Sequence, residues 1–130
     1  MSETSAPSVP VSSIAVGQVW TFRGAPGPVT RLVIGAIQDF HSRDAVSVAF
    51  TGVPNPADAQ GGLIEIPHMP FEASALAADL LELEETGAAA PAGFSEARQS
   101  WIREAGGLLS MAPARALAHA VRIAISRARA

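Results

Sequence analysis

Apolar and polar residues alternate along the first half of the chain, a pattern that predicts β-strands. In the segment 16–24 (VGQVWTFRG), Trp20 and Phe22 occupy alternate positions, so both aromatic side chains should lie on the inward face of a first strand. The run 29–38 is apolar on both faces at its centre, which is typical of a central strand. The run 45–51 alternates apolar with small or polar residues. We therefore expect three successive strands separated by short turns.

A loop rich in glycine and proline follows these strands. The segment 52–62 holds three glycines and two prolines, and such a long connection in a small domain is a candidate binding element. The run 63–69 (LIEIPHM) then predicts a fourth, short strand. Pro67 and Pro70 should place it at a sheet edge or end it, because proline cannot donate a hydrogen bond to a neighbouring strand.

The period of the pattern lengthens after Phe71, which predicts a short helix ending near Asp79. If that helix continued, it would gather glutamates at its negative C-terminal end, which is unfavourable. In the run 80–85 (LLELEE), leucine and glutamate alternate instead. We therefore expect a strand at 80–85.

Two more helices are predicted in the last third of the chain. After a linker-like loop at 86–93, Ser95 is a candidate N-cap for a helix that carries Trp101 on its apolar stripe and ends at two consecutive glycines. Pro113 falls in the first turn of an amphipathic C-terminal helix, where its missing N–H does no harm.

These elements predict one α+β domain over residues 14–128, preceded by a flexible N-terminal arm, rich in serine and proline, at 1–13. The expected architecture is a strongly bent antiparallel sheet or small open barrel of four to six strands. Two or three helices, including the C-terminal one, should cover it. A chain of 130 residues is long enough to bury its own core.

With these segments placed, the sequence resembles an uncharacterised family of small bacterial hypothetical proteins, a domain of unknown function. The likeness rests on VGQVWTF (16–22), RLVIGAI (31–37), VSVAFTGV (46–53), IEIPHMPF (64–71) and Trp101 ahead of GGLL (106–109). It spans residues 14–125 and implies the order of elements but no activity, so it assigns no catalytic residue. The chain departs from the family pattern near 86–100, which leaves the register up to Trp101 open. The Gly-Gln-Val-Trp opening is also similar to the first strands of SH3-like barrels, which include toxin and nucleic-acid-binding modules.

Composition narrows the class of protein. The chain has no cysteine, which excludes disulfides, thiolate metal clusters and a cysteine nucleophile. Its first residues carry no signal-peptide pattern, and its apolar runs are too short for a membrane span. We expect a soluble, cytoplasmic protein that does not contact a membrane.

Charge is unevenly distributed along the chain, although the net charge is only −3. Residues 72–104 hold seven acids against two arginines, whereas residues 105–130 hold four arginines and no acid. The acidic middle and the basic tail could neutralise each other within the fold or across a dimer.

Motifs of known chemistry are absent: the sequence contains no HExxH, GxSxG, P-loop or dinucleotide fingerprint. We therefore expect no catalytic residue, metal or cofactor. Asp39, His41 and Asp44 crowd one predicted turn, but turns attract such residues for their backbone chemistry alone. Glu65 and His68 are the best polar pair, although in a regular strand residues three apart point to opposite faces.

Three hypotheses for function remain. The leading one is a non-enzymatic module that binds a protein partner or its own copy through the apolar face beside the 52–62 loop, with Trp101, Arg115 and Arg122 as candidate interface residues. The first alternative is a small-ligand-binding protein or hydrolase with a pocket near Trp20, Glu65 and His68. The second is a nucleic-acid-binding barrel that uses the arginine-rich tail, against which stand the net negative charge, the absence of lysine and the scarcity of aromatic residues.

Overall fold

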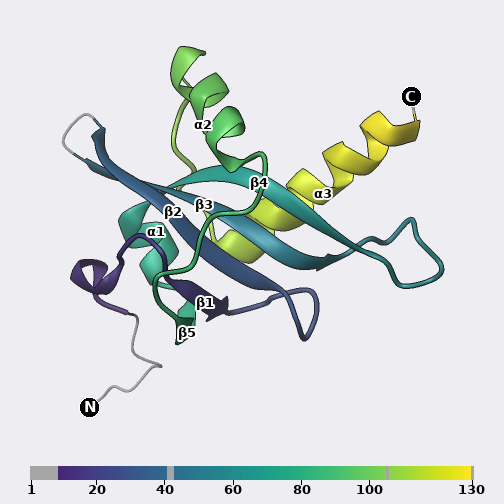
Figure 1. Ribbon diagram of the computed structural model, residues 1–130, viewed down its shortest axis with the longest axis horizontal. Coiled ribbons are helices and arrows are strands. Elements are labelled where there is room, and N and C mark those ends of the chain that lie inside the picture. Colours follow the sequence, from purple (N-terminus) through teal and green to yellow (C-terminus); the bar gives the residue numbers. More distant parts are fainter. Residues whose placement is uncertain (1–8, 41–42, 105, 130) are drawn as a thin grey trace.

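Five antiparallel strands form one open sheet in the order β4-β3-β2-β1-β5 (Figure 1). The computed structural model describes residues 9–40, 43–104 and 106–129. The strands are β1 (Val19–Phe22), β2 (Arg31–Phe40), β3 (Arg43–Pro54), β4 (Leu63–Glu72) and β5 (Leu80–Glu85). Strands β1 to β4 follow one another as a meander, and β5 returns to pair with the outer side of β1. The α+β fold with a bent, open sheet is thus confirmed.

Helices cover both faces of this sheet. They are η1 (Val11–Ser13), α1 (Ala73–Ala77), α2 (Phe94–Arg103) and α3 (Pro113–Arg129). Helices α1 and α3 lie behind the sheet in Figure 1, whereas the connection from β5 crosses the front of the sheet to reach α2. We call the face under α1 and α3 the inner face and the face under α2 the outer face. In the described part of the chain, no helix combines the length and apolarity that crossing a membrane requires.

The inner face holds the main hydrophobic core. Alternate residues of the strands supply Phe22, Phe50 and Phe71, whose rings pack edge to face at centroid distances of 5.4 and 6.3 Å around Phe50. Leu76 of α1 and Leu117 of α3 close this core from behind and are fully buried. Burial of such side chains contributes about 1.5–3 kcal/mol each to folding.

The first strand is shorter than the segment 16–24 that its pattern predicts. Gly17 adopts a left-handed backbone conformation with φ of 93°, which ends the regular strand on its N-terminal side. The buried Gln18 side chain then holds the preceding residues, because its Oε1 accepts a hydrogen bond from the Ala15 N–H (2.8 Å) and its Nε2 donates to the Ser13 carbonyl (2.8 Å). A separate hydrogen bond, from the Val9 N–H to the Ala77 carbonyl (3.2 Å), joins the residue two positions before η1 to the end of α1.

The later elements match their predicted order. The strand expected at 80–85 is present as β5, and Pro113 begins α3. Helix α2 begins one residue before the predicted cap: Gly93, with φ of 90°, occupies the N-cap position, so Ser95 lies inside the first turn. The fourth strand is an edge strand, as its prolines indicate, but it extends to Glu72.

Candidate functional site

Trp20 belongs to the inner core. Its side chain is only 5% exposed, and its indole N–H donates to Gln18 Oε1 at 2.9 Å. Its burial and its satisfied N–H make Trp20 a structural residue, which holds the N-terminal segment against β1.

His68 lies on the outer face of β4, which is separated from β1 by β3 and β2. Its Nε2 is 2.9 Å from Ser47 Oγ, and its ring contacts Phe94 and Trp101 at centroid distances of 5.6 and 5.5 Å. The register between β3 and β4 shifts beside His68. An irregularity of this kind can turn two residues three apart in a strand, such as Glu65 and His68, to the same face. Glu65 is exposed to solvent. The structure therefore places Glu65 and His68 on one strand and keeps Trp20 apart from both.

The environment of His68 favours its neutral form. Burial, and to a lesser extent the nearby Arg98 guanidinium, lowers the pKa of His68 from 6.5 to about 4. Ser47, its hydrogen-bonding partner, is itself buried at 2% exposure. A hydroxyl that substrate cannot reach does not act as a nucleophile, so we interpret the Ser47–His68 contact as a packing interaction.

Helix α2 covers this outer face through a small second core. Phe94 is buried and lies over Gly35, where an added Cβ would fall 2.3 Å from the Phe94 ring. Arg98 donates from Nη2 to Gln38 Oε1, while its buried Nε has no partner in the described structure. Trp101, a candidate interface residue, donates its indole N–H to the Gly107 carbonyl (3.1 Å) and packs on His68. Trp101 thus helps to attach α2 to the sheet.

An apolar groove of about 370 Å³ lies beside the N-terminal half of α3. Three segments that are distant in sequence line it: the β1–β2 loop, the end of β3 with the residues after it, and one face of α3. The lining residues are Gly24, Pro26, Val53, Pro54, Pro56, Ala114, Leu117, Ala118, Val121 and Arg122. We call this site the α3 groove. Most of its accessible lining is carbon, and Arg122 is the ionisable residue in it.

The walls of the α3 groove are tied together. Thr30 is fully buried and donates its hydroxyl to the Gly52 carbonyl at 2.8 Å, which joins the β1–β2 loop to the end of β3. Gly52 has φ of 61°, and an added Cβ would lie 2.4 Å from the Val29 carbonyl oxygen. Gly24 approaches α3 so closely that a Cβ there would be 3.0 Å from the Ala114 methyl group. The groove is therefore formed before any ligand arrives.

The loop that continues from this wall is also ordered. The Asp58 carboxylate accepts hydrogen bonds from the Gln60 N–H (2.8 Å) and the Gly62 N–H (3.1 Å), and the Asn55 N–H donates to the Gly62 carbonyl (3.0 Å). The predicted 52–62 binding element thus divides into a groove wall at its start and a closed hairpin loop beyond it.

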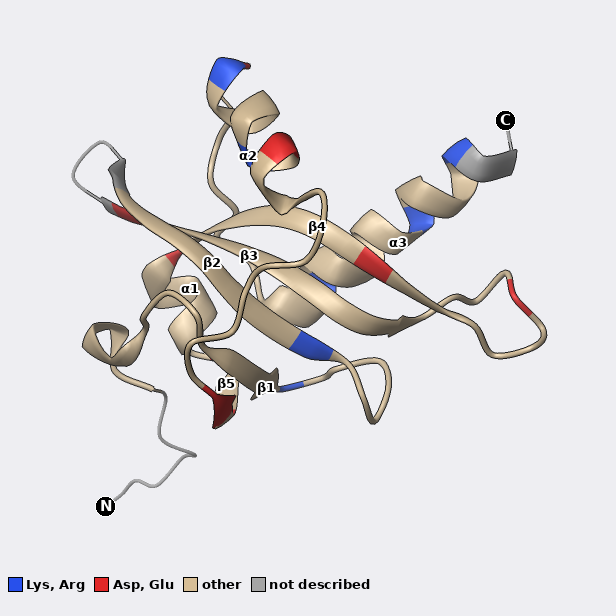
Figure 2. Ribbon diagram, viewed as in Figure 1, with Lys and Arg blue, Asp and Glu red and all other residues tan. Residues whose placement is uncertain are grey.

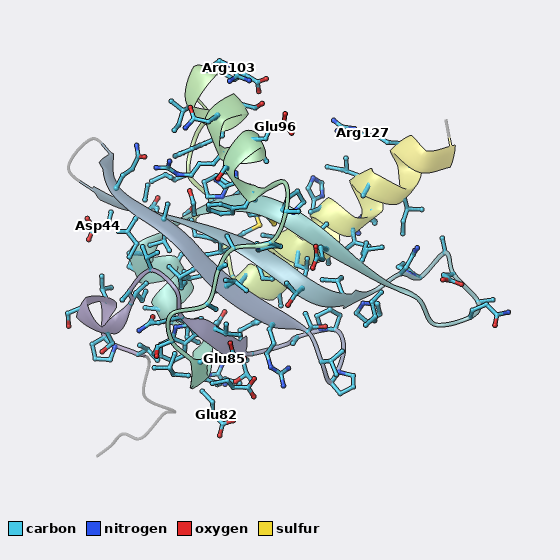
Figure 3. The ribbon with its side chains drawn as sticks, viewed as in Figure 1. Asp44, Glu82, Glu85, Glu96, Arg103 and Arg127 are labelled. Atoms are coloured by element: carbon cyan, nitrogen blue, oxygen red, sulfur yellow. The ribbon has the colours of Figure 1, made fainter. Side chains whose placement is uncertain are left out.

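The candidate interface arginines lie on α3 beside the groove. Residues 115, 119 and 122 are spaced by four and three, so they follow one another along one side of the helix. Arg115, His119 and Arg122 are exposed, and Arg122 Nη2 lies 3.3 Å from His119 Nδ1. We call these three residues the basic stripe. Figure 2 shows that the described part of α3 carries basic and no acidic residues, and Figure 3 places Arg127 towards its far end.

A second, smaller hollow of about 220 Å³ lies near α1 and is lined by Val11, Asp44, Glu72, Ala73 and Ser74. Among the residues that the structure describes, no three His, Asp or Glu side chains gather to hold a metal ion. His41 and the side chain of Asp39, which the sequence places in the same turn as Asp44, lie outside the described structure.

Sequence reasoning identified one wall of the α3 groove and Arg122, but missed the contribution of the β1–β2 loop. The signal for that contribution is the GAPGP run at 24–28, which lies between the first two predicted strands. The comparison with known proteins adds no further assignment: no protein-family model, curated protein or solved structure matches the chain.

Proposed function

We propose that this chain is a protein-interaction module that binds a short apolar segment of its partner in the α3 groove. The observation that carries the proposal is the groove itself: it is apolar, formed in advance, and bordered by the basic stripe. Preformed apolar concavities with a few placed polar groups are typical of binding sites. The ordered walls lower the entropic cost of binding.

The lining of the groove favours binding over catalysis. General acid–base or nucleophilic chemistry needs a side chain near the substrate that can accept a proton, donate one or attack. Arg122 is the ionisable residue in the lining, and its guanidinium offers hydrogen-bond donors but no acceptor for a substrate proton. Arg122 and its neighbours on the basic stripe instead suit a partner segment that carries a carboxylate next to its apolar side chains.

A groove-filling variant tests this function. Ala118 is exposed and lines the groove, so Ala118→Trp should fill the groove without disturbing the core. We expect the wild-type protein to enrich apolar, acid-containing sequences from a displayed random-peptide library, and we expect Ala118→Trp to lose them. Ala92→Trp adds the same side chain at an exposed position before α2 and is the matched control.

Enrichment that is equal for the wild type, Ala118→Trp and Ala92→Trp would show that the peptides bind elsewhere, and the proposal would be wrong. Circular dichroism and thermal unfolding of each variant establish that the groove, and not the fold, has changed.

A further inference from the structure

The acidic and basic regions of the chain remain separated in the folded molecule. In the described residues, the ion pairs join Arg23 to Asp79 (3.3 Å) and Arg31 to Glu84 (2.6 Å), and neither uses an arginine of α3. Strand β5 carries three glutamates, which lie at the sheet edge opposite β4 (Figure 2). The basic stripe on α3 is thus not neutralised by the acidic strand of its own chain.

Strand β5 combines exposed leucines with these glutamates. Leu81 and Leu83 are 47% and 44% exposed. Glu82 and Glu85, which Figure 3 labels, are exposed as well. In the described part of the chain, β5 is an edge strand, and no other strand pairs with its outer side. The segment is an apolar and acidic strip, the chemistry that the α3 groove and its basic stripe would accept.

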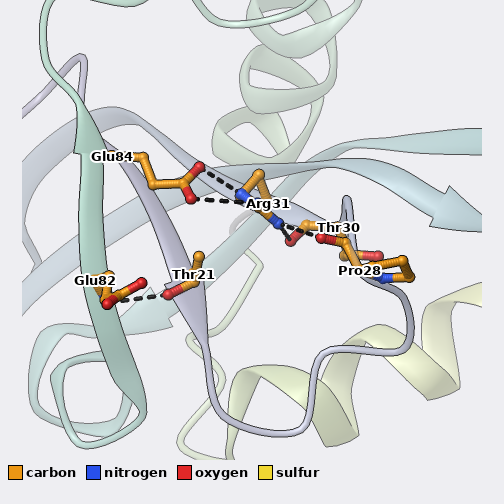
Figure 4. Close-up of polar contacts among 6 residues, drawn as sticks. All are labelled: Thr21, Pro28, Thr30, Arg31, Glu82 and Glu84. Carbon is orange, nitrogen blue, oxygen red and sulfur yellow. Dashed lines mark hydrogen bonds and ion pairs between the residues drawn. The ribbon is translucent and has the colours of Figure 1, made fainter.

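Strand β5 is held in the sheet of its own chain by backbone pairing and by side-chain contacts. It pairs with β1 through Phe22–Leu80 and Trp20–Leu83. The Arg31 guanidinium also holds Glu84 with two hydrogen bonds, Nε–Oε1 at 2.6 Å and Nη2–Oε2 at 3.2 Å, and the Glu82 N–H donates to Thr21 Oγ1 at 3.0 Å (Figure 4). The strip is therefore a fixed surface, available to another molecule.

We propose that the occupant of the α3 groove is β5 of a second copy of this chain. Leu81 and Leu83 of one protomer cover the apolar lining of the other, and Glu82 and Glu85 face the basic stripe. The same contact forms twice when the two copies are related by a twofold axis, so the assembly closes as a dimer. This inference rests on the proposed binding role of the groove and specifies its partner.

Charge reversal on each side of the contact tests the proposal. Arg122→Glu and Glu85→Arg change exposed side chains at the groove and on β5. Each variant alone should weaken self-association in sedimentation velocity by about tenfold or more, because like charges then face each other in both contacts. Mixing the two variants should restore the dimer, since both contacts of the mixed dimer again pair opposite charges.

Two variants on α2 provide matched controls. Arg103→Glu and Glu96→Arg make the same charge changes at exposed positions on the outer face, and both should dimerise like the wild type. Added salt should weaken the wild-type dimer, because it screens the attraction between the basic stripe of one copy and the glutamates of β5 in the other.

Cysteine crosslinking supplies a second measurement in a chain that has no cysteine of its own. Leu83→Cys and Ala118→Cys, mixed under mild oxidation, should give a crosslinked pair in higher yield than either variant alone. The wild-type background contributes no competing disulfide.

The outcomes separate this inference from the proposed function. A wild-type protein that stays monomeric at all concentrations, yet enriches peptides that Ala118→Trp loses, overturns the second copy as the occupant and leaves the groove as a binding site. A dimer that the charge reversals and Ala118→Trp leave intact also overturns the inference. A monomer that binds no peptide overturns both proposals.

Discussion

Individual residues of this protein matter mainly through what they touch on the two faces of the sheet. The side-chain amide of Gln18 has a structural role, because it makes hydrogen bonds with the Ala15 N–H, the Ser13 carbonyl and the Trp20 indole N–H. Among the described residues, His68 has a pKa that is lowered by burial, and its contacts with Ser47 of β3 and Phe94 of α2 explain why. A strongly shifted pKa is often a sign of catalysis. Here it follows from packing beneath a helix.

Replacement of His68 tests this interpretation through pH. The unfolded imidazole titrates near 6.5 and the folded one near 4, so between these values the unfolded state binds more protons. The free energy of unfolding should therefore fall as the pH is lowered from about 6.5 towards 4, and His68 should contribute no slope above that range. In urea unfolding at a series of pH values, His68→Gln should lack this part of the slope. Parallel curves for both proteins would contradict the lowered pKa.

At the scale of elements, local sequence patterns are sufficient to predict most of the helices and strands. The leucine–glutamate alternation of β5 and the proline that begins α3 are properties of consecutive residues, and both elements formed where they were predicted. The position of α2 could not be predicted in the same way, because it depends on Gly35 and His68, which are distant from it in sequence. The α3 groove likewise combines residues from Gly24 to Arg122, and a pattern along the chain does not show which segments meet.

The packing of α2 on the sheet can be tested by substitution of Gly35. Gly35→Ala introduces a methyl group 2.3 Å from the Phe94 ring, so the helix must shift, and we expect a loss of about 1–3 kcal/mol in the free energy of unfolding. Phe94→Leu should cost less in the Gly35→Ala background than in the wild type, because the smaller side chain relieves the overlap.

Gly107→Ala is the control for this experiment, since an added Cβ there meets nothing within 4 Å. It should change the free energy of unfolding by less than about 0.5 kcal/mol. Additive effects of Gly35→Ala and Phe94→Leu would show that α2 does not rest on Gly35.

The whole molecule is one sheet with two unequal cores. The inner core unites all five strands, α1 and α3 around aromatic side chains, whereas the outer core depends on α2 and one large buried side chain, Phe94. The surface is divided as well, with acidic β5 at one edge of the sheet and the basic stripe on α3. The inner core is the scaffold in this description. Helix α2, the exposed side of β5 and the basic stripe are features that can change without loss of that scaffold.

Hydrogen exchange should reveal the two cores as separate units. We expect the amides of α2 to exchange through a partial opening whose free energy is lower than that of global unfolding, because few buried contacts hold the helix. Amides of β2 and β3 should exchange only with global unfolding. Native-state exchange in low denaturant measures both classes, and a single common opening energy would contradict this division.

The place of β1 between β2 and β5 has a consequence for synthesis of the chain. The ribosome makes β1 to β4 in the order in which they pair, but the second neighbour of β1 appears only when residues 80–85 emerge. Until then the nascent meander presents β1, with Trp20 and Phe22, as an open border that other chains could join. The arrival of β5 replaces that border with one rich in glutamate, which repels further strands. We therefore expect the complete sheet to be less prone to edge-to-edge pairing than the nascent meander.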